Sequence, residues 1–85
     1  MFYLYVLKND IDELYFGSTN DLRKRLKEHN SGASKSTRKH KWKLIYYESY
    51  VAEVDARNRE HQIKYHGQAK AQLKRRIKNC IEDQS

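Results

Sequence analysis

The sequence predicts an α/β (α+β) domain in which a three-stranded antiparallel sheet is flanked by helices, in the order ββ-α-β-α-α. Two observations support this fold class. Segments rich in aromatic and branched residues lie on both sides of the first segment with helical periodicity, and the last third of the chain has helical periodicity alone. We expect residues 1–85 to form a single domain, because a chain of 85 residues is near the size at which one core suffices.

The first two strands are expected over residues 2–7 and 14–17. The polar stretch between them, residues 9–13, predicts a β-hairpin with an acidic loop. Side chains alternate across a strand, so Tyr3 and Tyr5 should share one face of the sheet while their apolar neighbours take the other.

A helix is expected over residues 21–30, with Thr19 or Asn20 as its cap and Gly32 at its end. A polar, basic loop is expected to follow over residues 33–41.

The third strand is expected over residues 42–47 and a second helix over residues 52–65, with Gly67 as a stop signal. From Gln68 onward the chain should form a last helix. Its apolar stripe has a spacing of four residues and consists of Leu73, Ile77 and Ile81.

The charge balance points to a polyanionic partner. The chain has 18 Lys and Arg residues against 11 Asp and Glu residues, which gives a formal net charge of +7. This favours nucleic acid over a neutral small molecule. Five residues of the basic loop are candidates for gripping phosphates, and the alternative is a solvated surface loop: Lys35, Arg38, Lys39, His40 and Lys41.

The chain has no apolar run of membrane-spanning length, so no membrane partner is expected. Cys80 is the only cysteine and can form neither an internal disulfide nor a zinc site of paired cysteines. We expect a cytoplasmic location.

The first helix carries two polar residues on its apolar stripe. Leu22, Arg25, Leu26 and His29 follow helical spacing, and the two leucines must face the sheet. Arg25 and His29 should therefore lie on or beside the buried face. The alternative is that Arg25 reaches the solvent at the edge and His29 only closes the helix against its dipole.

The second helix repeats this pattern with a carboxylate. Glu60 shares a stripe with Ala56 and Ile63, and a buried carboxylate needs a cation, which is either a protein side chain or a metal ion. The structural alternative is an ion pair between Glu60 and Arg25. We expect Tyr5 and Tyr15 to face the same side as Glu60.

These side chains suffice for the hydrolysis of a phosphodiester. Glu60 would hold one Mg²⁺ ion, and Arg25 would stabilise charge on the scissile phosphate. A tyrosine or His29 would take the proton from the attacking water. A tyrosine has an ordinary pKa of about 10 and would need that value lowered by the metal, Arg25 or His29. Gly17 suits a close approach of the backbone.

The residues resemble the GIY-YIG nuclease superfamily, in particular its small stand-alone bacterial members, which are similar to the N-terminal catalytic domain of the excinuclease incision subunit. Tyr3-Leu4-Tyr5 corresponds to the first motif and Tyr15-Phe16-Gly17 to the second. Residues 21–32 resemble the first-helix signature, and residues 56–64 the metal-binding segment. The first motif departs from the family because Tyr3 stands in place of its glycine.

The resemblance implies a DNA endonuclease with a single-metal mechanism, using Mg²⁺, for which Mn²⁺ can substitute. We expect it to select DNA by structure or by weak sequence preference. The expected catalytic residues are Tyr5, Tyr15, Arg25, His29 and Glu60, with Glu60 as the metal ligand.

Two alternatives remain open from the sequence. The chain could be a non-catalytic nucleic-acid-binding module, or an interaction subunit that docks on a larger DNA repair or mobile-element protein.

Overall fold

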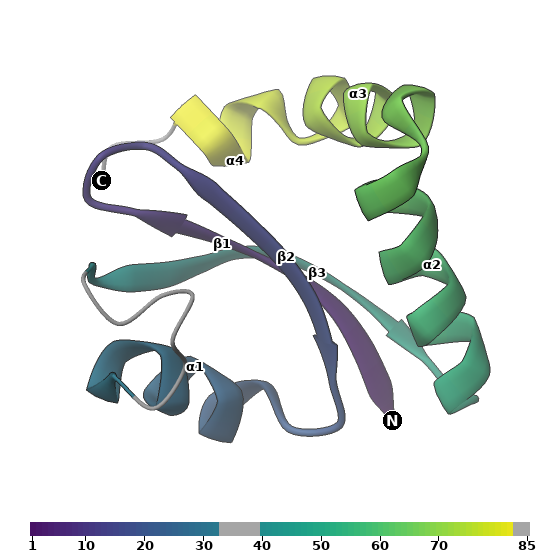
Figure 1. The fold of residues 1–85 in the computed structure, drawn as a ribbon, viewed down its shortest axis with the longest axis horizontal. Coiled ribbons are helices and arrows are strands. Elements are labelled where there is room, and N and C mark those ends of the chain that lie inside the picture. Colours follow the sequence, from purple (N-terminus) through teal and green to yellow (C-terminus); the bar gives the residue numbers. More distant parts are fainter. Residues whose placement is uncertain (33–39, 83–85) are drawn as a thin grey trace.

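The structure is a computed structural model that describes residues 1–32 and 40–82. Three strands form an antiparallel sheet in the order β2-β1-β3, and α1 lies on one side of this sheet while α2, α3 and α4 lie on the other (Figure 1). The elements are β1 (Phe2–Asn9), β2 (Leu14–Thr19), α1 (Leu22–Ser31), β3 (Trp42–Tyr50), α2 (Glu53–Tyr65), α3 (Gly67–Arg76) and α4 (Lys78–Glu82). The predicted fold class and element order are confirmed.

The alternation of side chains along β1 divides the core into two clusters, as predicted. Leu4 and Val6 face α2 and α3, where they pack with Ile63, Leu73 and Ile77. The residues that alternate with them face α1. That second cluster contains Tyr5, Leu7 and Trp42, with Tyr15, Leu22, Leu26 and Leu44 packed against it.

The hairpin between β1 and β2 is closed by a side chain. Asn9 Oδ1 accepts hydrogen bonds from the backbone N–H groups of Ile11 at 3.0 Å and Glu13 at 2.8 Å. These bonds satisfy backbone donors that the turn leaves without a ladder partner, and they set the register in which Tyr5 lies opposite Gly17.

The cap predicted for the first helix is wrong. Asp21 is the N-cap, because its backbone is extended (φ −147°, ψ 96°) and its carboxylate accepts from the N–H of Lys24 at 3.1 Å. Thr19 lies two residues before the N-cap, and its hydroxyl accepts a hydrogen bond from the N–H of Asp21 at 3.1 Å. Gly32 ends the helix as predicted, with a left-handed φ of 85°.

The sequence predicts Gly67 as the stop of the second helix, and this prediction is wrong. The chain leaves the helix at His66 (φ −123°, ψ 101°), and Gly67 is the first residue of α3. The last helix is divided at Ile77, although its predicted stripe is confirmed, since Leu73 and Ile77 are buried and Ile81 is half-buried. Within the described ranges, no helix is long and apolar enough to cross a bilayer.

Candidate active site

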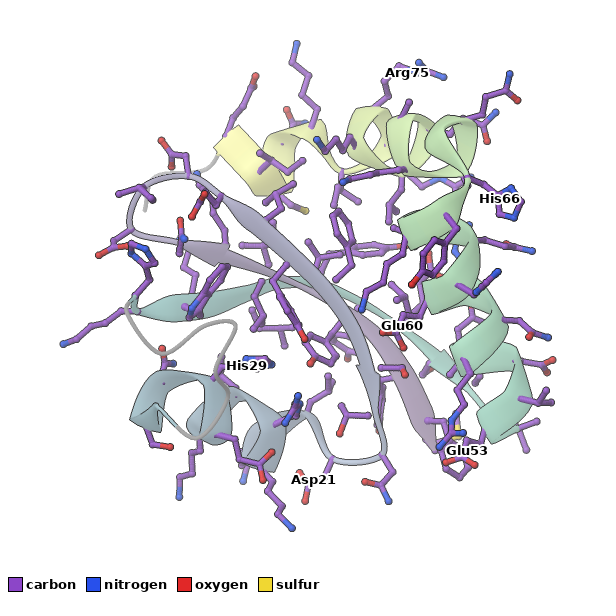
Figure 2. All side chains as sticks on the ribbon, in the orientation of Figure 1. Asp21, His29, Glu53, Glu60, His66 and Arg75 are labelled. Carbon is purple, nitrogen blue, oxygen red and sulfur yellow. The ribbon has the colours of Figure 1, made fainter. Side chains whose placement is uncertain are left out.

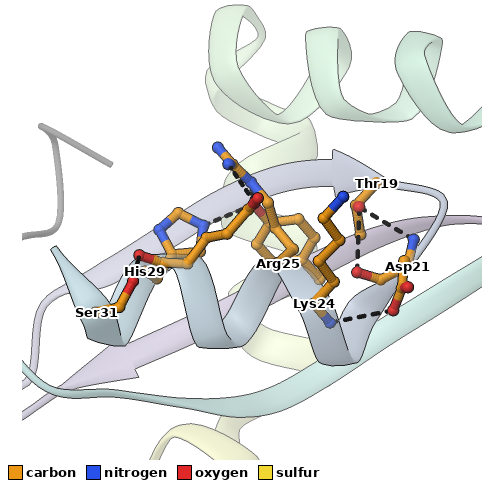
Figure 3. Close-up of polar contacts among 8 residues, drawn as sticks. Thr19, Asp21, Lys24, Arg25, His29 and Ser31 are labelled. Atoms are coloured by element: carbon orange, nitrogen blue, oxygen red, sulfur yellow. Dashed lines mark hydrogen bonds and ion pairs between the residues drawn. The ribbon is translucent and has the colours of Figure 1, made fainter. Parts of the chain in front are cut away.

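Tyr5 lies at the centre of the sheet face that α1 covers, and its side chain is only 2% exposed. Its register partner on β2 is Gly17, so no side chain stands between the Tyr5 ring and that strand. Arg25 and His29 reach the ring from α1, where both point toward the sheet (Figure 3). The predicted placement of these two residues on the inner side of the helix is confirmed.

A continuous row of hydrogen bonds connects the three side chains. Arg25 Nε donates to Tyr5 Oη at 3.3 Å, and Tyr5 Oη lies 2.9 Å from His29 Nε2. Arg25 also donates from its terminal nitrogen to Glu28 at 3.0 Å, which fixes the guanidinium on the helix surface.

Burial controls the protonation of this row. Burial raises the pKa of Tyr5 to about 12, although the hydrogen bond from Arg25 opposes the rise. Burial also lowers the pKa of His29 from its ordinary 6.5, and the charge of Arg25 lowers it further. At neutral pH, Tyr5 therefore keeps its proton and His29 is neutral. In the tautomer of His29 that carries its proton on Nδ1, Nε2 accepts a hydrogen bond from the Tyr5 hydroxyl.

A tyrosine that acts as a base would need the metal, Arg25 or His29 to lower its pKa. Arg25 does lower the pKa of Tyr5, but burial raises it by more. Loss of solvent around the phenolate outweighs the nearby guanidinium. In this state Tyr5 is protonated at neutral pH and can donate a hydrogen bond.

Tyr15 lies on the same face of the sheet as Tyr5, toward α1. The expectation that both tyrosines face the same side as Glu60 is wrong, because Glu60 comes from α2 on the other side of the sheet. The two rings are stacked with centroids 6.3 Å apart, and the Tyr15 ring meets the edge of His29 at 4.8 Å and of Trp42 at 6.1 Å. The second motif therefore holds His29 in place through ring packing as well as supplying a hydroxyl.

Glu60 approaches β2 from α2, on the other side of the sheet from α1 (Figure 2). Its carboxylate accepts from the hydroxyl of Ser18 at 2.5 Å and lies 2.7 Å from Lys64 Nζ. Burial would raise the pKa of Glu60, but the hydrogen bonds from Lys64 and Ser18 outweigh it, and the pKa lies below its ordinary value. The carboxylate is therefore ionised at neutral pH.

Two predictions about Glu60 need correction. Its side chain is 24% exposed and has polar neighbours, so it is not enclosed by apolar residues. The alternative of an ion pair with Arg25 is wrong, because Arg25 pairs with Glu28 and Glu60 pairs with Lys64.

Lys64 connects the two halves of the site around the edge of the sheet. Its ammonium group contacts Glu60 and also lies 5.7 Å from the centroid of the Tyr15 ring, within reach of a cation–π interaction. Sequence reasoning assigned no role to Lys64 or Ser18. The spacing of four residues between Glu60 and Lys64 is a signal for their pairing, whereas the contact of Ser18 depends on how α2 packs on β2.

The chemistry of this corner fits a divalent metal with few protein ligands. Glu60 is ionised, and the ammonium group of Lys64 shows that a cation is accommodated beside Oε2. Among residues 1–32 and 40–82, no three His, Cys, Asp or Glu side chains form a metal-binding group. Mg²⁺ suits such a corner, because it binds through one or two carboxylates and takes its other ligands from water and phosphate.

The basic loop lies largely outside the described residues, including Lys35, Arg38 and Lys39. Of its two described members, His40 contacts Asp10 of the hairpin loop at 2.9 Å, and Lys41 is exposed. A phosphate-binding role for this loop stays a prediction.

Comparison with known proteins agrees with this geometry. Residues 1–74 match the GIY-YIG catalytic domain. A UPF0213 protein of Clostridium perfringens is 44% identical over 66 residues, covering 75% of this chain and 71% of the relative. A UPF0213 protein of Bacillus pumilus is 44% identical over 64 residues (73% of this chain, 65% of the relative), and one of Haloquadratum walsbyi is 35% identical over 72 residues (82% and 81%). No solved structure matches the chain.

The fold and the site thus define a nuclease-type catalytic domain. The chain belongs to the GIY-YIG family and is similar to the small UPF0213 proteins within it.

Proposed function

We propose that this protein is an endonuclease that hydrolyses DNA phosphodiester bonds by a single-metal mechanism, with Mg²⁺ as the metal and Mn²⁺ as a substitute. The observation that carries the proposal is the hydrogen-bonded row of Arg25, Tyr5 and His29 on one side of the sheet, which Lys64 connects through Tyr15 to an ionised Glu60.

The row suits activation of water by proton relay. As a water oxygen attacks phosphorus, its proton passes to Tyr5 Oη while the Tyr5 proton passes to His29 Nε2. The relay leaves Tyr5 neutral throughout, which agrees with its raised pKa. His29 is the final acceptor, and its lowered pKa keeps it free of a second proton at neutral pH.

Arg25 is placed to stabilise the phosphate in the transition state. Its side chain is 35% exposed, so the N–H groups that Tyr5 and Glu28 do not use can reach a phosphate oxygen. A guanidinium that is already held in position stabilises charge as it develops, with little reorganisation.

Glu60 would hold the divalent ion, with Lys64 moving away from Oε2 to admit it. When bound, the metal would act as a Lewis acid on the phosphate oxygens. DNA as the substrate is supported by the family and by the net charge of +7. Selection by DNA structure, or by weak sequence preference, and a cytoplasmic location belong to the same proposal.

The test compares cleavage of nicked, flapped, branched and linear DNA with Mg²⁺ or with a chelator. We expect Glu60→Gln to abolish cleavage, because the amide keeps the shape of the side chain and removes the charge that holds the metal. DNA binding and the melting temperature should change little, since an ion pair of this exposure contributes about 0 to 1 kcal/mol. Glu53→Gln is the matched control, because Glu53 lies on the same helix and is exposed.

Full activity of Glu60→Gln would show that Glu60 is not the metal ligand. Salt-dependent DNA binding with no cleavage, unaffected by Mg²⁺ or by Glu60, would instead favour a non-catalytic binding module.

A further inference from the structure

Helix α1 covers only part of its side of the sheet. It packs against the hairpin end, where Leu7, Trp42 and Leu44 lie, and leaves the N-terminal end of β1 and the C-terminal end of β3 without a helix on that side (Figure 1). Two tyrosines occupy the uncovered part. Tyr47 is 52% exposed, and Tyr3 is half-buried beside it.

The two rings contact each other and lie next to Tyr5 of the candidate active site. Their centroids are 5.7 Å apart at an interplanar angle of 74°. Tyr47 is the register partner of Tyr5 across β1 and β3, and Tyr3 lies two residues before Tyr5 on the same face. A group resting on this pair would therefore lie next to the residue that we propose to relay the proton.

This pair keeps an open aromatic surface. A cross-strand aromatic pair contributes to the stability of a sheet, and half of the Tyr47 surface is still exposed. Tyr3 also replaces the glycine of the first motif, so the aromatic surface depends on the residue at which this chain departs from the motif.

We propose that Tyr3 and Tyr47 form a stacking platform for an unpaired base of the DNA strand that is cut. This inference rests on the proposed function. Aromatic rings on which bases stack are a general means by which proteins hold single strands, because every base has a π face. The net charge of +7 favours a nucleic-acid partner. Bases within a duplex are already stacked on their neighbours, so the platform should favour flaps, gaps and single strands over intact duplex.

The test measures DNA binding without divalent metal, so that cleavage does not interfere. The probes are a single-stranded oligonucleotide that contains 2-aminopurine and its duplex with a complementary strand, both at one salt concentration. The variants are Tyr3→Thr and Tyr47→Thr, because the β-branched threonine also suits a strand. Tyr47→Trp restores a ring, and Tyr65→Thr is the control for loss of an exposed tyrosine, since Tyr65 is 72% exposed on α2.

We expect each threonine variant on the sheet to weaken single-strand binding by about five- to 150-fold, the range measured for loss of one stacked base. Quenching of 2-aminopurine should be lost in parallel. Duplex affinity should stay within about twofold and the salt dependence should not change, because no charge is removed. Tyr47→Trp and Tyr65→Thr should bind as the wild type does, and melting curves should show that each variant is folded.

Two outcomes would overturn the platform. The platform is wrong if the threonine variants bind single strands as tightly as the wild type does, or if they lose affinity for single strands and duplex equally. In either case, Mg²⁺-dependent cleavage by the wild type would leave the nuclease proposal intact. If the wild type neither binds nor cuts DNA of either kind, the proposed function and the platform both fail.

Discussion

Gly17 lies directly against the hydroxyl end of Tyr5. A Cβ atom at Gly17 would stand 2.5 Å from Tyr5 Oη and 2.7 Å from Cζ, which is closer than such atoms can approach. The two residues belong to different motifs and face each other across β1 and β2. The glycine of the second motif is thus required by the tyrosine of the first, since any side chain would displace the hydroxyl from Arg25 and His29.

Gly17→Ala should therefore impair catalysis more than folding. The ring of Tyr5 would have to move by about an ångström, and a misplacement of that size in a catalytic group costs on the order of 100-fold in rate. The strain of the added methyl group should lower the free energy of unfolding by about 1 to 3 kcal/mol. Single-turnover cleavage rates and thermal melts on the same variant check both numbers.

Gly67→Ala provides the matched control. A Cβ at Gly67 would meet no atom within 4 Å, and the residue begins α3. This variant should cut at the wild-type rate and be as stable as the wild type or slightly more so. An unchanged rate in Gly17→Ala as well would show that the position of the Tyr5 hydroxyl is unimportant for the reaction.

Much of the site could be predicted because its geometry is local. Alternation along a strand places Tyr5 on one face, and helical spacing places Arg25 and His29 on the side of the helix that the leucines bury. Hairpin pairing then brings Tyr15 to the same face. Each step needs only the period of an element and the identity of its buried side.

The remaining features depend on tertiary contacts that no local pattern encodes. Ser18 reaches Glu60 only because α2 packs on β2, and the pKa of Tyr5 rises because burial outweighs a neighbouring guanidinium. Thr19, Asn20 and Asp21 are all residue types that suit a cap, and Asp21 takes this position because α1 begins at Leu22.

The pH dependence of cleavage should reveal the state of His29. Its pKa is lowered by burial, so the rate should be constant near neutral pH and fall only below 6.5, when Nε2 takes a proton and can no longer accept one. Residual cleavage by His29→Asn should lack this acidic limb. An acidic limb centred above 6.5 would contradict the buried, neutral imidazole.

The free energy of unfolding should also depend on pH through the protonation of His29. Below pH 6.5 the unfolded chain binds a proton at His29 before the folded chain does, so the free energy of unfolding should decrease as the pH falls from 6.5 toward the lower pKa of the folded state. Denaturant melts at several pH values would measure this decrease, which should be absent in His29→Asn.

Glu48 is expected to stabilise the opposite side of the sheet. It accepts from Tyr46 at 2.9 Å, from Tyr50 at 2.6 Å and from Arg59 Nε at 2.9 Å. Glu48→Gln should lower the free energy of unfolding by about 1 to 3 kcal/mol, because hydrogen bonds to a charged group are replaced by weaker ones. Arg59 precedes Glu60 on α2, so loosening of this contact should also weaken metal binding.

The stabilising effect of Glu48 should depend on pH. Burial raises its pKa, but hydrogen bonds from Arg59, Tyr50 and Tyr46 outweigh burial, and the pKa lies below its ordinary 4.5. The contribution is therefore complete above pH 4.5 and is lost as the pH falls through the lower value. Glu53→Gln is the control, since its ion pair with Arg57 is exposed and its loss should change stability little.

Arg25→Ala should reduce turnover far more than DNA affinity. Many of the 18 basic residues can hold the DNA backbone, whereas the guanidinium of Arg25 touches Tyr5 and faces the expected position of the phosphate. Loss of one electrostatic donor to a transition state costs on the order of 10²- to 10³-fold in rate. Arg25→Lys should recover little of this, because an ammonium group cannot reproduce the planar fork that spans two phosphate oxygens.

Glu28→Gln distinguishes catalysis from support of the helix. Glu28 forms the only ion pair of Arg25 among the described residues, so this variant removes the ion pair and keeps the guanidinium beside Tyr5. If Arg25 acts on the phosphate, Glu28→Gln should keep most of the activity while Arg25→Ala loses it at an unchanged melting temperature. If both variants lower the melting temperature equally and the rate per folded molecule stays constant, Arg25 is a structural residue of α1.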